Sequence, residues 1–183
     1  MFTGRKAPEL QGGFLLDSGV HFIASLRLLL DAIGEKANEV LALSSLLEKH
    51  LHPADTIHAI VSTTDSRRGT ICISFGVEHK STLEIEIIST RGVVVWTAVS
   101  VKSMIKSDSG ESMEETKEFI YNNAVMAEFE AFGQAILQNS PDPRHSPLEA
   151  LNDLSFLQCL LESAESNGSI KAVDLIGDQN IHS

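Results

Sequence analysis

Residues Gly12 to Leu30 read GGFLLDSGVHFIASLRLLL, and this stretch places a helix at the start of the fold. Its apolar residues recur at helical spacing, as Phe22, Leu26, Leu29, Leu30 and Ile33. Gly34 then supplies a C-terminal stop. The spacing predicts a helix from about Asp17 to Ile33 whose apolar face is buried against a second layer.

The composition is that of a globular protein. Of the 183 residues, 43% are hydrophobic and 21% are charged. A chain of this length removes roughly 70% of its unfolded surface from water. We therefore expect a single domain over residues 1–183, with a leader over 1–10, a core over 11–176 and a tail over 177–183. No apolar run reaches the ~20 residues of a membrane helix, and no secretory signal is recognisable, so we expect a cytoplasmic protein without a membrane partner.

Charge and cysteine usage exclude further classes of partner. The formal net charge is −11, and the densest basic site is the pair Arg67-Arg68. Nucleic acid requires a concentrated positive face, so we expect no nucleic-acid partner. Cys72 and Cys159 lie in apolar stretches without metal-type spacing, which predicts buried free thiols.

From Val40 to Ile105 the periodicity changes from helical to alternating, which predicts strands joined by antiparallel hairpins. Breaks in the alternation fall at Gly69, at Glu78–Ser81 and at Arg91-Gly92. The stretch from Arg91 to Ile105 is predicted to be one longer strand, apolar on both sides. One of its faces then needs cover from a partner subunit, so we expect a homodimer.

The last third of the chain predicts a loop and two helices. Lys106 to Glu115 is polar and rich in serine and glycine, as loops are. A helix is predicted from Phe119 to Leu137, and a second from Ser146, a good N-cap, to about Ser166. A short final strand or an extended tail is predicted at Ile170–Ile176. This order predicts an α+β fold with helices packed on an antiparallel sheet.

Asp17 and His21 are the candidate chemical pair. They are four residues apart, so within a helix they lie on the same side. An imidazole beside a carboxylate suits general acid or base chemistry, or a hydrogen bond to a carbonyl oxygen. In the alternative interpretation, Asp17 is only the helix N-cap and His21 a half-buried helix residue.

Motifs for nucleotides and metals are missing from the sequence. Neither GxGxxG nor GxxxxGK[ST] occurs, and there is no GxSxG elbow. His50 and His52 are followed at once by Pro53, which indicates a solvated loop. We therefore expect no cofactor and no metal.

The stretch GGFLLDSGVHFIASLR resembles the segment that opens the C-terminal domain of the glucose-fructose oxidoreductase, inositol dehydrogenase and MocA family. EFEAFGQAI resembles that family's penultimate helix, and SPLEALNDLSFLQCLLESAESNGSIKAV its last helix and closing strand. The chain is most similar to fungal members and resembles a stand-alone C-terminal domain. The resemblance implies an open, mostly antiparallel sheet with helices on one face.

The resemblance also implies roles for individual residues. Asp17 and His21 match the acid and the histidine that hold and deprotonate the substrate hydroxyl in family dehydrogenases. Four further residues are expected to bind the substrate: Gly13, Ser25, Tyr121 and Asn122. Ala24 stands where many members have a second Asp, and the Rossmann half is missing from this sequence.

These departures argue against hydride chemistry on NAD. We therefore expect a cofactor-independent enzyme for a small organic substrate, an isomerase, a cyclase such as one for pericyclic ring closure, or a lyase in specialised metabolism. The segment Lys106 to Tyr121 is expected to close the pocket. The alternative is a non-catalytic substrate-binding or dimerisation domain of a split or truncated oxidoreductase.

Overall fold

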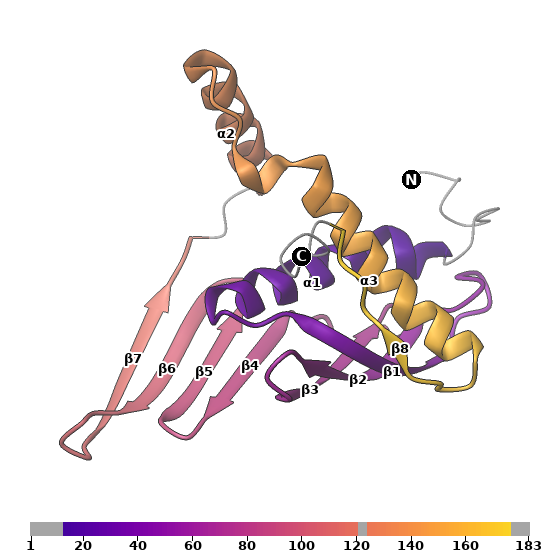
Figure 1. Cartoon of the computed structure of the whole chain (residues 1–183), viewed down its shortest axis with the longest axis horizontal. Coiled ribbons are helices and arrows are strands. Elements are labelled where there is room, and N and C mark those ends of the chain that lie inside the picture. The colour runs from indigo at the N-terminus through magenta and orange to yellow at the C-terminus, as the bar shows by residue number, and fades with distance from the viewer. Residues whose placement is uncertain (1–12, 121–123, 177–183) are drawn as a thin grey trace, which may run out of the picture. The chain divides into compact units, whose positions relative to one another are not determined.

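The structure is a computed structural model that describes residues 13–120 and 124–176. The chain divides into two compact units, one formed by the residues up to Glu78 and from Pro143 onward, the other by His79–Asp142. The expectation of one domain stays a prediction. The first unit consists of α1 (Gly13–Ala32), β1 (Ala37–Ser45), β2 (Thr56–Thr63), β3 (Arg68–Ser74), η2 (Pro143–His145), α3 (Pro147–Glu165) and β8 (Lys171–Ala172). Figure 1 labels its α-helices and strands.

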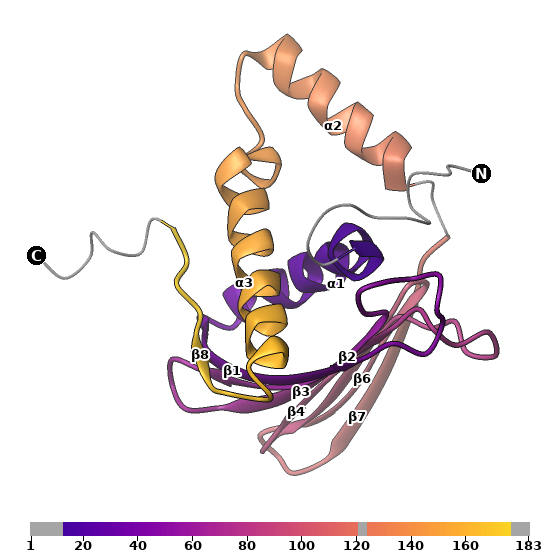
Figure 2. The ribbon, with the colours of Figure 1, turned by 90° about the vertical axis from the view of Figure 1, so that its right-hand side faces the viewer.

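The first unit is a two-layer structure with one apolar core. Its four strands are antiparallel in the order β3-β2-β1-β8. Figure 2 shows α1 and α3 on the same side of this sheet. Alternation along β2 directs Ile57, Ala59 and Val61 into the core, where they meet buried side chains of both helices. The predicted α+β class, with helices on one face of an antiparallel sheet, is confirmed.

The first helix begins earlier than the sequence predicts. It starts at Gly13, not near Asp17, so Asp17 lies in its second turn and is not its N-cap. Gly13 adopts a left-handed φ of 51°, and a side chain there would collide with the carbonyl oxygen of His52. The predicted stop is confirmed, because Gly34 has a φ of 72° and the Glu35 N–H donates to the Leu30 carbonyl at 2.9 Å.

The strands of the second unit form a sheet in the order β4-β5-β6-β7. These strands are β4 (Glu84–Ser89), β5 (Gly92–Thr97), β6 (Ser100–Lys106) and β7 (Ser112–Glu118). The single long strand predicted from Arg91 to Ile105 is therefore wrong, because the chain reverses after Thr97. The Thr97 hydroxyl oxygen accepts the Ser100 N–H at 3.1 Å, so this hairpin forms without a glycine or proline at its turn.

The predicted loop from Lys106 to Glu115 is wrong over half of its length. Only the turn between Lys106 and Ser112 is irregular, and β7 follows it. Every residue of β7 is exposed, so the strand has no apolar face that the sequence could reveal. Its partner strand holds it through the backbone and through an ion pair of 2.7 Å between Lys102 and Glu114.

The two C-terminal helices match their predictions unequally. Helix α2 runs from Ala124 to Gln138. It therefore begins five residues after the predicted start at Phe119, which lies outside the helix. Helix α3 begins as predicted: the Ser146 hydroxyl oxygen accepts the Glu149 N–H at 3.1 Å, and Pro147 occupies the first helical position. The predicted closing strand is present as β8, which covers only Lys171–Ala172.

Two expectations about side-chain environment need correction. Both cysteines are free, but Cys72 is exposed and Cys159 half-buried, because Cys72 alternates onto the outer face of β3. Among the described residues, α1 is long and apolar enough to cross a membrane by length and composition, with a mean hydropathy of 1.4. It nevertheless packs in the core through Leu15, Gly19 and Ile23. The absence of a membrane partner stays a prediction.

Candidate functional site

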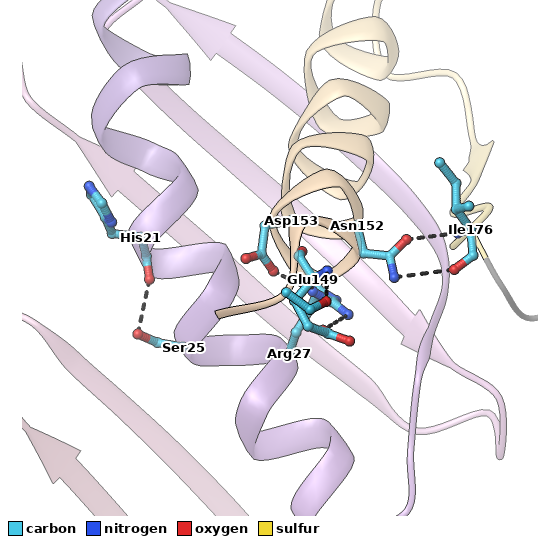
Figure 3. A network of polar contacts seen from close by, with 8 residues as sticks. His21, Ser25, Arg27, Glu149, Asn152, Asp153 and Ile176 are labelled. Atoms are coloured by element: carbon cyan, nitrogen blue, oxygen red, sulfur yellow. Dashed lines mark hydrogen bonds and ion pairs between the residues drawn. The ribbon is translucent and has the colours of Figure 1, made fainter. Parts of the chain in front are cut away.

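Asp17 and His21 lie together on the exposed side of α1. Both are exposed, whereas Leu15 and Ile23 on the opposite side of the helix are buried. Because the helix is already formed at Asp17, the spacing of four residues places the two side chains one turn apart. In Figure 3, His21 points away from α3. The pair is thus accessible to a ligand and supported from behind by the core.

The remaining predicted site residues have different positions. Ser25 lies one turn beyond His21 and is half-buried, and its hydroxyl donates to the His21 carbonyl at 3.0 Å (Figure 3). Gly13 is the first residue of the helix, and a side chain at this position would collide with the His52 carbonyl oxygen. This glycine therefore has a structural role. Tyr121 and Asn122 lie outside the described residues. The binding roles of all four stay predictions.

Three aromatic rings pack together at the N-terminal half of α1. Phe75, just after β3, contacts Phe14 edge to face with ring centroids 5.0 Å apart, and Phe22 with centroids 6.0 Å apart. All three rings are half-buried. Phe14 and Phe22 are two turns apart on α1, on the side next to His21. Helix α1 thus carries both the exposed His21 and two of the three rings of this half-buried aromatic cluster.

Arg27 anchors α1 to α3 and is the polar residue whose role the sequence did not reveal. Its guanidinium is buried, pairs with Asp153, and contacts Glu149 Oε2 at 2.8 Å (Figure 3). Burial alone would lower the pKa of Arg27, but hydrogen bonds to Asp153 and Glu149 outweigh it and raise the pKa. Arg27 thus stays charged and holds the helix that carries His21.

A second polar contact ties down the chain after β8. The buried Asn152 of α3 accepts the Ile176 N–H at 2.7 Å and donates to the Ile176 carbonyl at 3.3 Å (Figure 3). A side-chain amide that satisfies both backbone groups of one residue replaces a strand partner there. Helix α3 therefore binds α1 on one side and the closing segment on another.

The described residues offer little for a metal ion. Within 13–120 and 124–176, no three His, Cys, Asp or Glu side chains lie close enough to hold one. His50 is exposed and its Nδ1 lies 3.5 Å from a Glu48 carboxylate oxygen, in the loop before β2. The chemistry available at α1 is therefore that of a carboxylate, an imidazole and a hydroxyl.

Comparison with known proteins identifies relatives of the whole chain. The profile of the oxidoreductase family, C-terminal alpha/beta domain, matches residues 3–172. The dehydrogenase FPY6 of Fusarium mangiferae is 78% identical over 169 residues, which are 92% of this chain and 48% of that protein. The chain thus spans about half the length of this curated relative.

Solved structures show the same fold. An oxidoreductase from Thermotoga maritima is 27% identical, with a TM-score of 0.76, over 94% of this chain and 48% of the other. A levoglucosan dehydrogenase in complex with NADH and levoglucosan is 17% identical, with a TM-score of 0.78, over 94% of this chain and 53% of the other. In both, the likeness covers about half of the larger chain.

Proposed function

The chain belongs to the oxidoreductase family, whose C-terminal alpha/beta domain it matches. From this premise we propose that the chain is a small-molecule enzyme, and that it binds its substrate at the exposed side of α1 and works without a nicotinamide cofactor. The proposed reaction class is an isomerisation or cyclisation. The observation that carries the proposal is the exposed pair Asp17 and His21 on a helix that the core and Arg27 hold in place. A rigidly mounted acid–base pair is what positional catalysis requires.

In the proposed step, His21 removes a proton from a substrate hydroxyl or from a carbon beside a carbonyl group, and returns it at another atom. Asp17 orients the imidazole and stabilises its protonated form. Such a step balances without an oxidant, because the proton that leaves one atom is restored at another. A bond that closes between two parts of the same substrate needs only positioning and a hydrogen bond at the carbonyl oxygen.

The environment of His21 favours a substrate with an apolar part. Phe14 and Phe22 share α1 with His21 and pack on Phe75, so we propose that the apolar part of the substrate lies toward these rings while its oxygen reaches His21. A fully hydroxylated substrate would leave these rings unused. The partner we propose is therefore a small organic molecule with one carbonyl or hydroxyl group next to an apolar body.

A second candidate function rests on the length of the relative. Because a protein 78% identical and about twice as long is named a dehydrogenase, the chain also fits a substrate-binding or dimerisation domain of a split or truncated oxidoreductase. In that case Asp17 and His21 would position a substrate whose hydride goes to a nucleotide bound elsewhere. The two candidates differ in the mass of the product, since isomerisation leaves it unchanged and dehydrogenation removes two hydrogens.

The experiment uses that difference. Purified chain is incubated with a fungal metabolite extract, with and without NAD and NADP, and the mixture is followed by mass spectrometry. We expect a compound that is converted to an isomer without added nucleotide, and whose conversion stops in His21→Ala. Asp31→Asn is the matched control, an exposed acid on the same helix. Conversion that requires nucleotide and changes the mass would support the second candidate instead.

We also propose that the chain forms a homodimer through the sheet of the second unit. One face of this sheet is apolar, because the register aligns Ile85 with Trp96 and Val101, and Ile87 with Val94. These side chains are half-buried, not buried, so the face lacks a full cover. Light scattering of Val94→Glu against the native chain tests this: a native dimer and a monomeric variant are expected, and a native monomer at high micromolar concentration would refute it.

A further inference from the structure

Asp55, the residue directly before β2, is an acidic residue with no exposed surface. Its carboxylate accepts the N–H groups of Leu47 at 3.0 Å and Glu48 at 2.7 Å, and the Thr56 hydroxyl at 2.8 Å. All three of these donors are uncharged. Burying a carboxylate costs far more than burying a neutral side chain, so this residue needs an explanation.

On one side, the Asp55 carboxylate holds the connection between β1 and β2, residues 46–55. Its two backbone donors lie near the start of this connection, and Asp55 itself ends it. Further along, the His52 carbonyl oxygen lies so close to Gly13 that a side chain there would collide with it. Gly13 is the first residue of α1. The connection that Asp55 holds therefore abuts the beginning of the helix that carries the candidate pair.

On the other side, Asp55 holds the end of β3. The Phe75 N–H donates to the Asp55 carbonyl oxygen at 2.9 Å, and a side chain at Gly76 would lie 2.6 Å from the carboxylate. Because the Thr56 hydroxyl already donates to Asp55, the Ser74 hydroxyl donates to the Thr56 oxygen at 2.7 Å. Three successive residues at the end of β3 are thus fitted to this one acid.

The Phe75 ring connects this segment to α1. Its centroid lies 5.0 Å from that of Phe14 and 6.0 Å from that of Phe22. Both partner rings belong to the N-terminal half of α1, and the candidate pair lies between them in the sequence. Asp55 is therefore connected to this half of the helix in two ways, through the β1–β2 connection and through Phe75.

From these contacts we infer that Asp55 is a positioning residue for Asp17 and His21. Asp55 holds the N-terminal half of α1, whereas Arg27 holds the C-terminal half through its contacts with α3. The pair lies between these two anchors. A displacement of about 1 Å at a catalytic group can cost ~100-fold in rate, so both anchors matter for turnover. The effect on turnover rests on the function proposed for α1, whereas the effect on the helix does not.

The test is hydrogen exchange of the backbone amides of the full chain, measured by NMR. Asp55→Asn keeps the shape of the side chain but replaces one acceptor oxygen by an N–H2 group. Amides 17–22 should then exchange at least about tenfold faster, as for the loss of a hydrogen bond to a charged group, and amides 27–32 should change less. Asp153→Ala, which weakens the Arg27 anchor, should reverse the order of the two halves.

Val61→Ala is the matched control, because it removes buried side-chain atoms from the same strand, β2, away from Asp55. Its exchange should rise by the same factor in both halves of α1. Ser74→Ala removes the outer hydroxyl and should give a smaller effect of the same kind as Asp55→Asn, which keeps the test available if that variant does not fold. Circular dichroism shows whether each variant is folded. Equal acceleration of both halves by the variants of Asp55 and Ser74 would overturn the inference.

Turnover is a separate readout. In the isomer conversion described above, kcat of Asp55→Asn should fall by about tenfold to a hundredfold with KM nearly unchanged, whereas Val61→Ala should keep the native kcat. A native kcat in Asp55→Asn, despite faster exchange of amides 17–22, would overturn the positioning role. If the native chain converts no compound but the exchange pattern is present, the proposed function fails and Asp55 stands as the anchor of this half of α1.

Discussion

The two units of this chain differ in how many buried side chains they contain. Every buried apolar side chain among the described residues belongs to the first unit, including Phe156, Leu157 and Leu160 of α3. Between His79 and Asp142, no described residue is buried. The first unit therefore has the core that holds a fold together, whereas the second is held mainly by its strand ladder.

Helix α2 of the second unit shows this contrast most clearly. Its apolar residues recur along one stripe, and Phe129, Phe132 and Ile136 are 67%, 55% and 63% exposed. An apolar stripe of this kind normally packs against a second surface. The comparison indicates that the apolar core of the described residues lies in the first unit, and the exposed stripe on α2 fits the proposal that a further surface covers the second unit.

The largest expected effect tests where the core lies. Phe156→Ala should destabilise the protein by about 3–5 kcal/mol, because Phe156 is fully buried and its removal leaves a cavity. Ile88→Ala in the second unit, where the side chain is 73% exposed, should change stability by at most about 0.5 kcal/mol. Urea unfolding measures both. Equal losses would show that the second unit also has a core in solution.

A smaller effect compares one ion pair from each unit. Asp153→Ala should cost about 2–3 kcal/mol, because it leaves the buried Arg27 guanidinium with fewer partners. Lys102→Ala removes a pair in which both side chains are 54% exposed, and should cost under about 1 kcal/mol. Raising the salt concentration should weaken the second pair more than the first. Similar costs in urea unfolding would refute the ranking.

An acid titration sharpens the comparison further. Glu35 is 1% exposed, and hydrogen bonding from Thr63 lowers its pKa against the effect of burial; the Asp65 backbone N–H, which donates to the carboxylate at 3.2 Å, and the charge of Arg67 lower it further. Because the folded-state pKa lies below the unfolded one, the stabilisation is present above the ordinary glutamate range and is lost as the pH falls through the folded-state pKa. Glu35→Gln should be less stable at neutral pH and should lose part of this acid dependence. An unchanged slope of stability against pH would contradict the assignment.

The last prediction on stability concerns His21 of the candidate pair. His21→Ala should alter the free energy of unfolding by under about 1 kcal/mol, because the imidazole is exposed and no described packing depends on it. Thermal melting measures this against the native chain. A loss as large as that of Phe156→Ala would mean that His21 is a structural residue, as in the alternative interpretation of the sequence.

Local signals explain which elements could be predicted. The start of α3 and the stop of α1 depend on Ser146 and Gly34, whose chemistry acts within a few residues. Strand β7 could not be predicted because it lacks an apolar face, and the turn after Thr97 because a side chain replaces the usual glycine. The outward direction of Cys72 was missed because alternation shows two faces without showing which one is covered.

In the candidate site, too, local features could be predicted from the sequence and long-range contacts could not. Asp17 and His21 are four residues apart, so their common side of the helix was predictable from spacing. The partners of Arg27 are Glu149 and Asp153, which are 122 and 126 residues away along the chain. No local pattern reports such a contact, so the anchor that holds α1 became visible only in the structure.

The most direct test of the proposed proton transfer by His21 is the conversion carried out in heavy water. If His21 takes a proton from the substrate and exchanges it with solvent before returning it, the isomeric product gains one deuterium, and His21→Ala forms no product while keeping the native melting temperature within a few degrees. A product formed equally fast by the variant in which both Asp17 and His21 are replaced by alanine would contradict the account.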